Sequence, residues 1–173
     1  TLQAWTTPAA LKPGDATLDI IASLLASGRS SRLYRRMVHE ESIALEVDAG
    51  QYSQHLESLF LIDAKPAEGH TMEELEAVIS EELERLADEG PTTAELERAV
   101  NQLEVDFLRN LESLQARASA LNRYQALVGD PGWIDRDLAR YREVTAADVQ
   151  HICRTHLSSA RRAIIRVHPE DSP

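Results

Sequence analysis

The sequence predicts an α+β fold, in which helices pack on one face of a small antiparallel sheet. The expected elements follow the order β-α-α-β-β-α-α-α-α-β, whereas parallel α/β folds alternate strand and helix. Two strands are neighbours with a short connection, which favours an antiparallel hairpin. The chain has 173 residues, and we expect residues 1–173 to form a single domain with a core of its own.

A strand and two helices are expected first along the chain. Leu2–Thr7 has the composition of a short strand. Asp15 is a candidate N-cap for the following helix, which Gly28 ends. A second helix is expected from Ser30 to about Glu41. The first helix carries a wide apolar face, so we expect it to be largely buried.

The two strands of the expected hairpin follow. Leu45, Val47 and Ala49 alternate with acidic residues, which predicts a strand with these three side chains on its buried face. Leu59–Ala64 is almost continuously apolar, which predicts a strand in the middle of the sheet.

Two long helices are expected in the second half. Thr71–Glu74 and Thr92–Glu95 each form a capping box, and the first box begins a helix that ends near Asp88. After the second box, apolar residues recur every three or four positions, which predicts one helix of about 30 residues. Its inward side chains are expected to be Leu96, Val100, Leu103, Phe107, Leu111, Leu114, Ala118 and Leu121.

Two shorter helices and a strand complete the chain. Trp133–Val144 predicts the first helix, and Thr145–Asp148 caps the second. The inward side chains of the second are expected to be Val149, Ile152, Cys153 and Leu157. Ala163–Val167 predicts a final strand before a polar tail from residue 168 to residue 173.

The charge of the chain is strongly negative and local. The net charge is −11, and residues 68–112 carry all of it, with 14 acidic and 3 basic residues there against 15 of each elsewhere. An acidic surface repels nucleic acids and anionic membranes, so neither is an expected partner. The acidic segment is interpreted either as two solvated helix faces or as a wall that attracts a basic partner. No apolar run approaches about 18 residues, so no transmembrane helix is expected.

Residue types that carry catalysis are not arranged in a recognisable site. The six histidines show no H-x-x-E-H or H-E-x-x-H spacing, and His151 and His156 lie on different sides of a helix. The single cysteine, Cys153, lies on the apolar side of a helix. The sequence contains no glycine-rich phosphate loop and no nucleophile elbow. We therefore expect no catalytic residue and no metal ligand in this chain.

Three segments in order resemble the pitrilysin/insulinase-like zinc peptidases. The first is 26–44, which contains SGRSSRLY and then HEESIA. The second is Thr92–Leu96, which is similar to the family's T-x-x-E-L segment at the start of a long helix. The third is Val144–Gln150, followed by a helix, Leu157 and a strand that closes on Pro169. The ordered set covers nearly the whole chain and is more specific than any one motif.

The resemblance implies a fold and a place in a larger enzyme. These peptidases are built from homologous α+β halves, of the processing-peptidase-like metallohydrolase fold, that close like a clamshell around an unfolded peptide. In one half an H-x-x-E-H helix and a distal glutamate hold zinc, and the glutamate of that motif activates the zinc-bound water. This chain lacks the motif, so the resemblance implies the C-terminal, zinc-free half, with zinc in the parent or partner domain.

The resemblance also locates a pair of positions that contact substrate in the family. In the zinc-free half, an arginine and a tyrosine often stabilise the substrate carbonyl and its developing oxyanion. The matching positions here are Val38 and Leu45, and neither side chain can donate a hydrogen bond. Arg35 and Arg36 lie earlier on the same helix and are the candidates for a substitute.

Three alternative functions follow. The first is a non-catalytic domain of a zinc metalloendopeptidase that encloses and positions peptide substrate, is inactive alone, and works with a homologous zinc-bearing half in the same or another chain. The second is a proteolytically inactive scaffold of the processing-peptidase core-subunit type. The third is an acidic interaction domain in which neutralising four glutamates abolishes binding of basic proteins; these are Glu73, Glu76, Glu81 and Glu84. The family variant that the chain resembles suggests a bacterial source. Whether the protein forms a dimer, and whether it lies in the periplasm or the cytoplasm, is left open.

Overall fold

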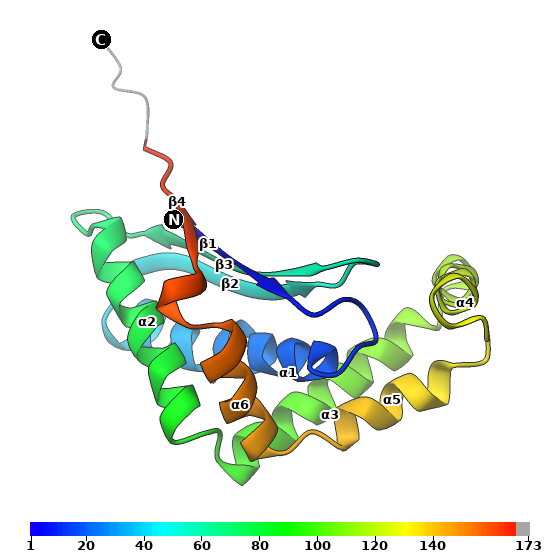
Figure 1. The fold of residues 1–173 in the computed structure, drawn as a ribbon. Helices are drawn as coiled ribbons and strands as arrows, with labels where there is room; N and C mark the ends of the chain where they lie inside the picture. The colour runs from blue at the N-terminus through cyan, green and yellow to red at the C-terminus, as the bar shows by residue number, and fades with distance from the viewer. Residues whose placement is uncertain (169–173) are drawn as a thin grey trace.

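Four antiparallel strands form one sheet, and helices cover one of its two faces (Figure 1). The computed structural model describes residues 1–168. The strands are β1 (Leu2–Thr7), β2 (Ala44–Tyr52), β3 (Ser58–Pro66) and β4 (Ala163–Ile165), and their order across the sheet is β2-β3-β1-β4. The predicted α+β class, the β2–β3 hairpin and the inner position of β3 are confirmed.

The core lies between the sheet and helix α1 (Asp15–Ala26), which runs beneath it (Figure 1). Because side chains alternate along a strand, Trp5, Phe60 and Ile62 all point from the sheet into this core. Trp5 and Phe60 meet edge to face, with ring centroids 6.2 Å apart. Ten of the twelve residues of α1 are buried, as its apolar composition predicts.

Three more helical segments pack around this core. These are the π-helix η1 (Tyr34–Glu40), α2 (Met72–Asp88) and α6 (Ala146–His156). The capping boxes at Thr71 and Thr145 are formed, so α2 and α6 begin where the sequence predicts. A short 3₁₀ turn, η2 (Ser159–Arg161), connects α6 to β4.

The remaining helices form an arm that extends from the core, which we call the helical arm (residues 93–142). It contains α3 (Thr93–Asn110), α4 (Leu114–Val128) and α5 (Ile134–Arg142), and Figure 1 shows α4 at its far end. The capping box at Thr92 is formed as predicted.

The prediction of one helix of about 30 residues is wrong. The helix breaks after Asn110, and Ser113 caps a new helix by accepting a hydrogen bond from the backbone N–H of Ala116 at 3.4 Å. The apolar repeat continues across the break, but Leu114 and Leu121 are 78% and 44% exposed. A regular apolar repeat does not reveal that a serine within it has ended one helix and begun another.

Three other expectations need correction. Leu45 is 59% exposed, because a β-bulge between Ala44 and Glu46 adds a residue and breaks the predicted alternation. The N-cap of α1 is Gly14, and Asp15 instead accepts hydrogen bonds from the Leu11 N–H and the Ser53 hydroxyl. The last strand stops at Ile165 rather than Val167, and the predicted end of the chain from residue 169 lies outside the described residues.

Among residues 1–168, none of the helices combines the length and the apolar character needed to cross a lipid bilayer.

Candidate functional site

The sheet face that turns away from the helices is the candidate site, and we call it the open face. Strand register places on it every second side chain of each strand. Its residues are Leu2, Ala4, Thr6, Glu46, Asp48, Gly50, Tyr52, Leu59, Leu61, Asp63, Lys65, Ala163 and Ile165. Figure 1 shows no helix across this face in the described part of the chain.

The open face has an apolar centre. Ala4, Gly50 and Leu61 form one row across three strands, and Tyr52 and Leu59 lie in the next row. The Tyr52 ring leans over Gly50, since a Cβ atom on that glycine would lie 3.2 Å from the ring Cε2 atom. Tyr52 and Leu59 remain 53% and 38% exposed. Such a shallow apolar strip suits the side chains of an extended peptide.

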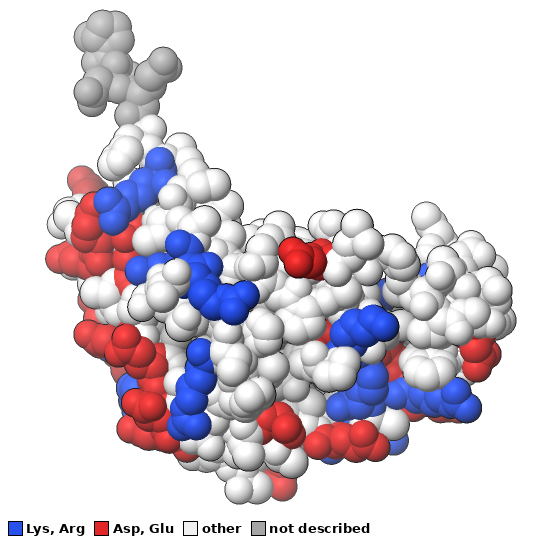
Figure 2. Space-filling view, viewed as in Figure 1, with Lys and Arg blue, Asp and Glu red and all other residues white. Residues whose placement is uncertain are grey.

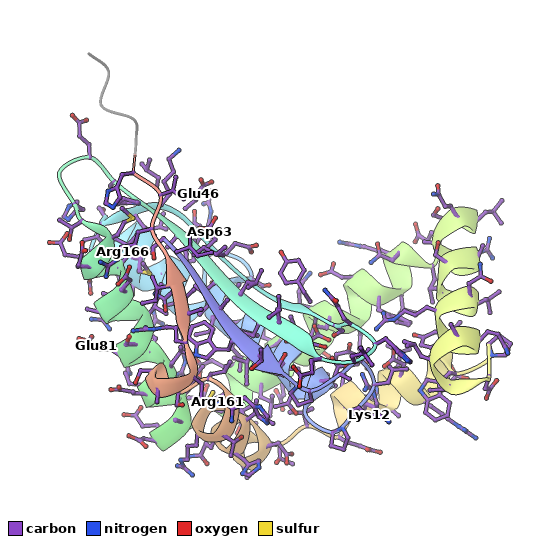
Figure 3. All side chains as sticks on the ribbon, turned by 45° about the horizontal axis from the view of Figure 1, so that its top comes forward. Lys12, Glu46, Asp63, Glu81, Arg161 and Arg166 are labelled. Atoms are coloured by element: carbon purple, nitrogen blue, oxygen red, sulfur yellow. The ribbon has the colours of Figure 1, made fainter. Side chains whose placement is uncertain are left out.

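One end of the open face is acidic. Asp48 and Asp63 are register partners on β2 and β3, and Glu46 pairs with Lys65 one row further on. Figure 3 shows Glu46 and Asp63 at this end of the sheet. Like charges directly opposite each other on a sheet are destabilising, so this pair weakens the hairpin rather than supporting it.

The longer edge of the sheet is β2. It has nine residues and pairs only with β3, so its outer side carries backbone N–H and C=O groups without strand partners among the described residues. An edge of this kind can accept an added strand. The opposite edge, β4, has only three residues.

The two positions that match the family's arginine and tyrosine lie on η1 and at the start of β2. Val38 is partly buried and packs against the core, whereas Leu45 is the exposed residue of the β-bulge. Both side chains are apolar, so neither can donate a hydrogen bond to a substrate.

Of the two candidate substitutes, Arg36 is held by three carboxylates. Its nitrogens lie 2.7 Å from Glu41, 2.6 Å from Glu81 and 3.2 Å from Glu82. The hydrogen bonds that Arg36 donates, with that to Glu41 as the largest cause, raise its pKa. Arg36 therefore links η1 to α2, and it could reach a substrate only by leaving these partners.

Arg35 is free of such a network. Its Nε atom lies 3.4 Å from Glu40, and both side chains are more than half exposed. An exposed pair at this distance contributes little stability, so Arg35 is the more mobile of the two candidates.

A nearly buried ion pair joins two of the segments that carry the resemblance. Arg32 donates to Glu95 at 2.8 and 2.9 Å and to the Gly90 carbonyl at 3.1 Å. The bond from Arg32, with those from Thr92, lowers the pKa of Glu95 to about 2. Sequence periodicity does not show this pair, because 63 residues separate its members. The only signal was that both residues lie within family-like segments.

The acidic segment is partly neutralised within the fold. Arg166 binds Glu73 at 2.8 Å and Glu76 at 2.6 Å, and Arg36 binds Glu81. Figure 2 shows basic side chains next to the acidic ones on the side formed by α2, and Figure 3 marks Arg166 and Glu81 there. Neutralising these glutamates would therefore break fold contacts as well as change the surface charge.

Metal-ligating side chains do not gather into a site in the described part of the chain, and the single cysteine is not activated. Within residues 1–168, no three His, Cys, Asp or Glu side chains are placed to hold a metal ion. Burial raises the pKa of Cys153 to about 12, so the thiol stays protonated at neutral pH.

Comparison with known proteins gives one family. The family model described as the peptidase M16 inactive domain matches residues 1–103. An uncharacterized zinc protease of Streptomyces coelicolor is 27% identical over 139 residues, which cover 79% of this chain and 30% of that protein. This chain therefore spans less than a third of that relative's length.

Solved structures agree with this match. An inactive peptidase domain of a Bordetella parapertussis zinc protease has a TM-score of 0.83 and 25% identity, over 99% of this chain and 94% of that one. A Bordetella pertussis protein named as a zinc protease has a TM-score of 0.80 and 26% identity, over 96% and 93%. A Helicobacter pylori protease has a TM-score of 0.83 at 22% identity, over 93% of this chain and 39% of that one, and supports the fold alone.

The match covers more than half of the chain, and it includes both β2–β3 and the Arg32–Glu95 ion pair. The structural likeness extends over the helical arm as well. The chain belongs to the peptidase M16 family, as its inactive C-terminal peptidase domain.

Proposed function

We propose that this domain forms one wall of a peptide-binding chamber, facing a homologous zinc-bearing half in the same or another chain. The open face carries this proposal. It is the one extended surface of the sheet that the described helices leave bare, and its centre is apolar. The zinc and the water-activating glutamate would belong to the other half, and this domain would position the peptide.

The peptide would be held by backbone and side-chain contacts rather than by a catalytic pair. The β2 edge offers backbone hydrogen bonds, and the Tyr52–Leu59 row offers apolar contact. Val38 and Leu45 offer no hydrogen bond to a substrate carbonyl. On this proposal the oxyanion is stabilised by groups outside this domain.

Val38 and Leu45 also favour a second candidate function, that of a scaffold. A domain that has lost both donors could serve only to stabilise its partner half, as in inactive homologues of processing peptidases. A scaffold needs no affinity for peptide, so peptide binding separates the two candidates.

The test is binding of an unfolded peptide to the open face. A fluorescein-labelled, unstructured peptide of mixed sequence would be titrated with the chain and with Tyr52→Ser and Leu59→Ser, followed by anisotropy. Each variant should weaken binding about fivefold or more, because each loses apolar contact area. Leu114→Ser is the matched control, since Leu114 is 78% exposed but lies on α4. Equal affinity of all four proteins, or no binding at all, would count against the chamber wall and for the scaffold.

A further inference from the structure

A cavity of 390 Å³ opens at the end of β1 that lies furthest from the acidic end of the open face. Its lining comes from β1 and the loop after it, the β2–β3 turn, the last residue of α6 and the last residue of η2. The residues that matter here are Thr6, Thr7, Lys12, Glu57, His156 and Arg161. Figure 3 shows Lys12 and Arg161 at this end of the sheet, opposite Glu46 and Asp63.

The cavity lies where β4 would continue if it were longer. β4 begins at Ala163, opposite Ala4, so β1 has no strand partner on this side from Trp5 to Thr7 among the described residues. The Trp5 indole N–H donates to the Ser158 carbonyl at 3.0 Å, which holds the chain near β1 just before η2. Beyond that contact, the last two residues of β1 pair with β3 on one side and line the cavity on the other. A short extended segment could pair with β1 here.

The cavity is positively charged, in a chain whose net charge is −11. Lys12 and Arg161 are both exposed, and neither has a salt bridge within residues 1–168. Glu57 is the acidic residue of the lining. Two positive charges and one negative charge give the lining a net charge of +1, which one negative charge on a ligand would balance.

His156 supplies an unused polar group to the same cavity. Its Nδ1 atom is buried and has no hydrogen-bond partner in the described part of the chain. Burial, helped by Arg161, lowers the pKa of His156, so the ring is neutral at pH 7. A buried polar atom without a partner is costly, and a ligand that meets it after a small rotation of the ring would remove that cost.

We infer that this cavity binds the C-terminal carboxylate of an extended peptide, with the peptide backbone alongside Thr6 and Thr7 and the carboxylate between Lys12 and Arg161. A peptide end combines an extended backbone with one negative charge, which are the two things the cavity accommodates. A phosphate dianion suits it less, because two cations and Glu57 leave a lining that balances one negative charge. The negative end of the α6 dipole at His156 also opposes a dianion more than a monoanion. The inference rests on the proposed function in that it takes peptide as the ligand.

Two fluorescein-labelled hexapeptides of the same apolar sequence, one with a free C-terminal carboxylate and one with a C-terminal amide, provide the test by anisotropy. The acid should bind about tenfold more tightly than the amide, as expected for one charge-assisted hydrogen-bonded contact. Arg161→Gln and Lys12→Gln should each weaken binding of the acid several-fold and leave the amide unchanged. Arg117→Gln is the matched control, because Arg117 is an exposed arginine on α4 outside the cavity.

Equal binding of acid and amide by the unaltered chain would overturn the inference, as would an acid preference that survives the double variant of Lys12 and Arg161. Stronger displacement of the peptide by inorganic phosphate than by acetate, at equal ionic strength, would overturn the carboxylate assignment. Thermal melts of each variant check that the fold is kept. Failure here leaves the Tyr52 and Leu59 result untouched, so the two proposals fail separately.

Discussion

At the scale of single residues, the structure explains why two weak sequence motifs occur together. Arg32 and Glu95 come from different family-like segments and meet as a nearly buried ion pair, with side chains 9% and 20% exposed. Arg32 also holds the Gly90 carbonyl, which fixes the turn between α2 and α3. The pair therefore sets the direction in which the helical arm leaves the core.

Glu95→Gln should destabilise the domain by about 2 kcal/mol, because it leaves the buried Arg32 charge unpaired while keeping the α3 cap. This corresponds to a fall in melting temperature of roughly 4–8 °C. The pKa of Glu95 is lowered to about 2, so its stabilising effect is present above pH 4.5 and is lost as pH falls toward 2. The difference in melting temperature between Glu95→Gln and the unaltered chain should therefore become smaller at acidic pH.

Glu97→Gln, an exposed neighbour on the same helix, is the control and should leave the melting temperature nearly unchanged. If Glu95→Gln melted together with this control at pH 7, the Arg32–Glu95 pair would not be what fixes the turn.

At the scale of elements, the helical arm joins the core through both apolar and polar contacts. Leu96, Ala99, Val100 and Leu103 of α3 pack against the core. The three helices of the arm contribute few buried apolar side chains, namely Ala99, Tyr124 and Leu138. The Tyr141 hydroxyl donates to Asp19 on α1 at 2.7 Å, and Arg140 lies 3.3 Å from Asp15. The hydrogen bonds and charges in this joint make it respond to pH more than apolar contacts alone would.

Asp19 makes this joint sensitive near neutral pH. Burial, with a smaller effect of Asp15, raises its pKa to about 7, while the Tyr141 bond and the charges of Arg140 and Arg123 oppose the rise. The folded state thus holds a proton that the unfolded state releases near pH 4. The free energy of unfolding should therefore fall as pH rises from about 4 to about 7.

Asp19→Asn should remove this dependence, because the amide stays neutral and can still accept the Tyr141 hydrogen bond. The melting temperature of the variant minus that of the unaltered chain should therefore increase by at least about 2 °C between pH 5 and pH 8. Asp48→Asn, on the open face, is the control and should keep the original slope. A constant difference between the Asp19 variant and the unaltered chain across this range would exclude Asp19 as the titrating group.

At the scale of the whole molecule, both proposals concern binding: the open face and the β2 edge would hold a peptide, and the cavity would hold its C-terminal carboxylate. Residues 1–168 contain no group of three His, Cys, Asp or Glu side chains that could hold a metal. This chain covers less than a third of the Streptomyces coelicolor relative. We therefore expect hydrolysis to require a second, zinc-bearing half.

The chain alone should contain well under one zinc per protein by elemental analysis, and it should leave a fluorogenic peptide intact over hours. Adding a homologous half that carries H-x-x-E-H should restore cleavage if the two halves complete each other. A zinc ratio near one for this chain, with peptidase activity removed by a chelator, would show a site that neither the sequence nor the structure reveals.

The sequence alone determined the parts of this protein that depend on local chemistry. Capping boxes marked three helix starts correctly, because a Thr and an acidic residue three positions apart satisfy each other's backbone donors wherever they occur. Apolar runs identified α1, which is buried over most of its surface, and the inner strand β3, which is buried on one face only. The order of the motifs identified the family. The sequence itself contains no H-x-x-E-H motif.

The tertiary structure decided everything that depends on contacts between distant segments. The bulge that exposes Leu45 depends on how β2 meets β3, and the break before α4 places Leu114 and Leu121 in solvent. The Arg32–Glu95 pair, the Asp19 joint and the cavity beyond β4 all join residues that are tens of positions apart. Sequence periodicity records which face of an element is apolar, but only the packed fold determines what that face meets.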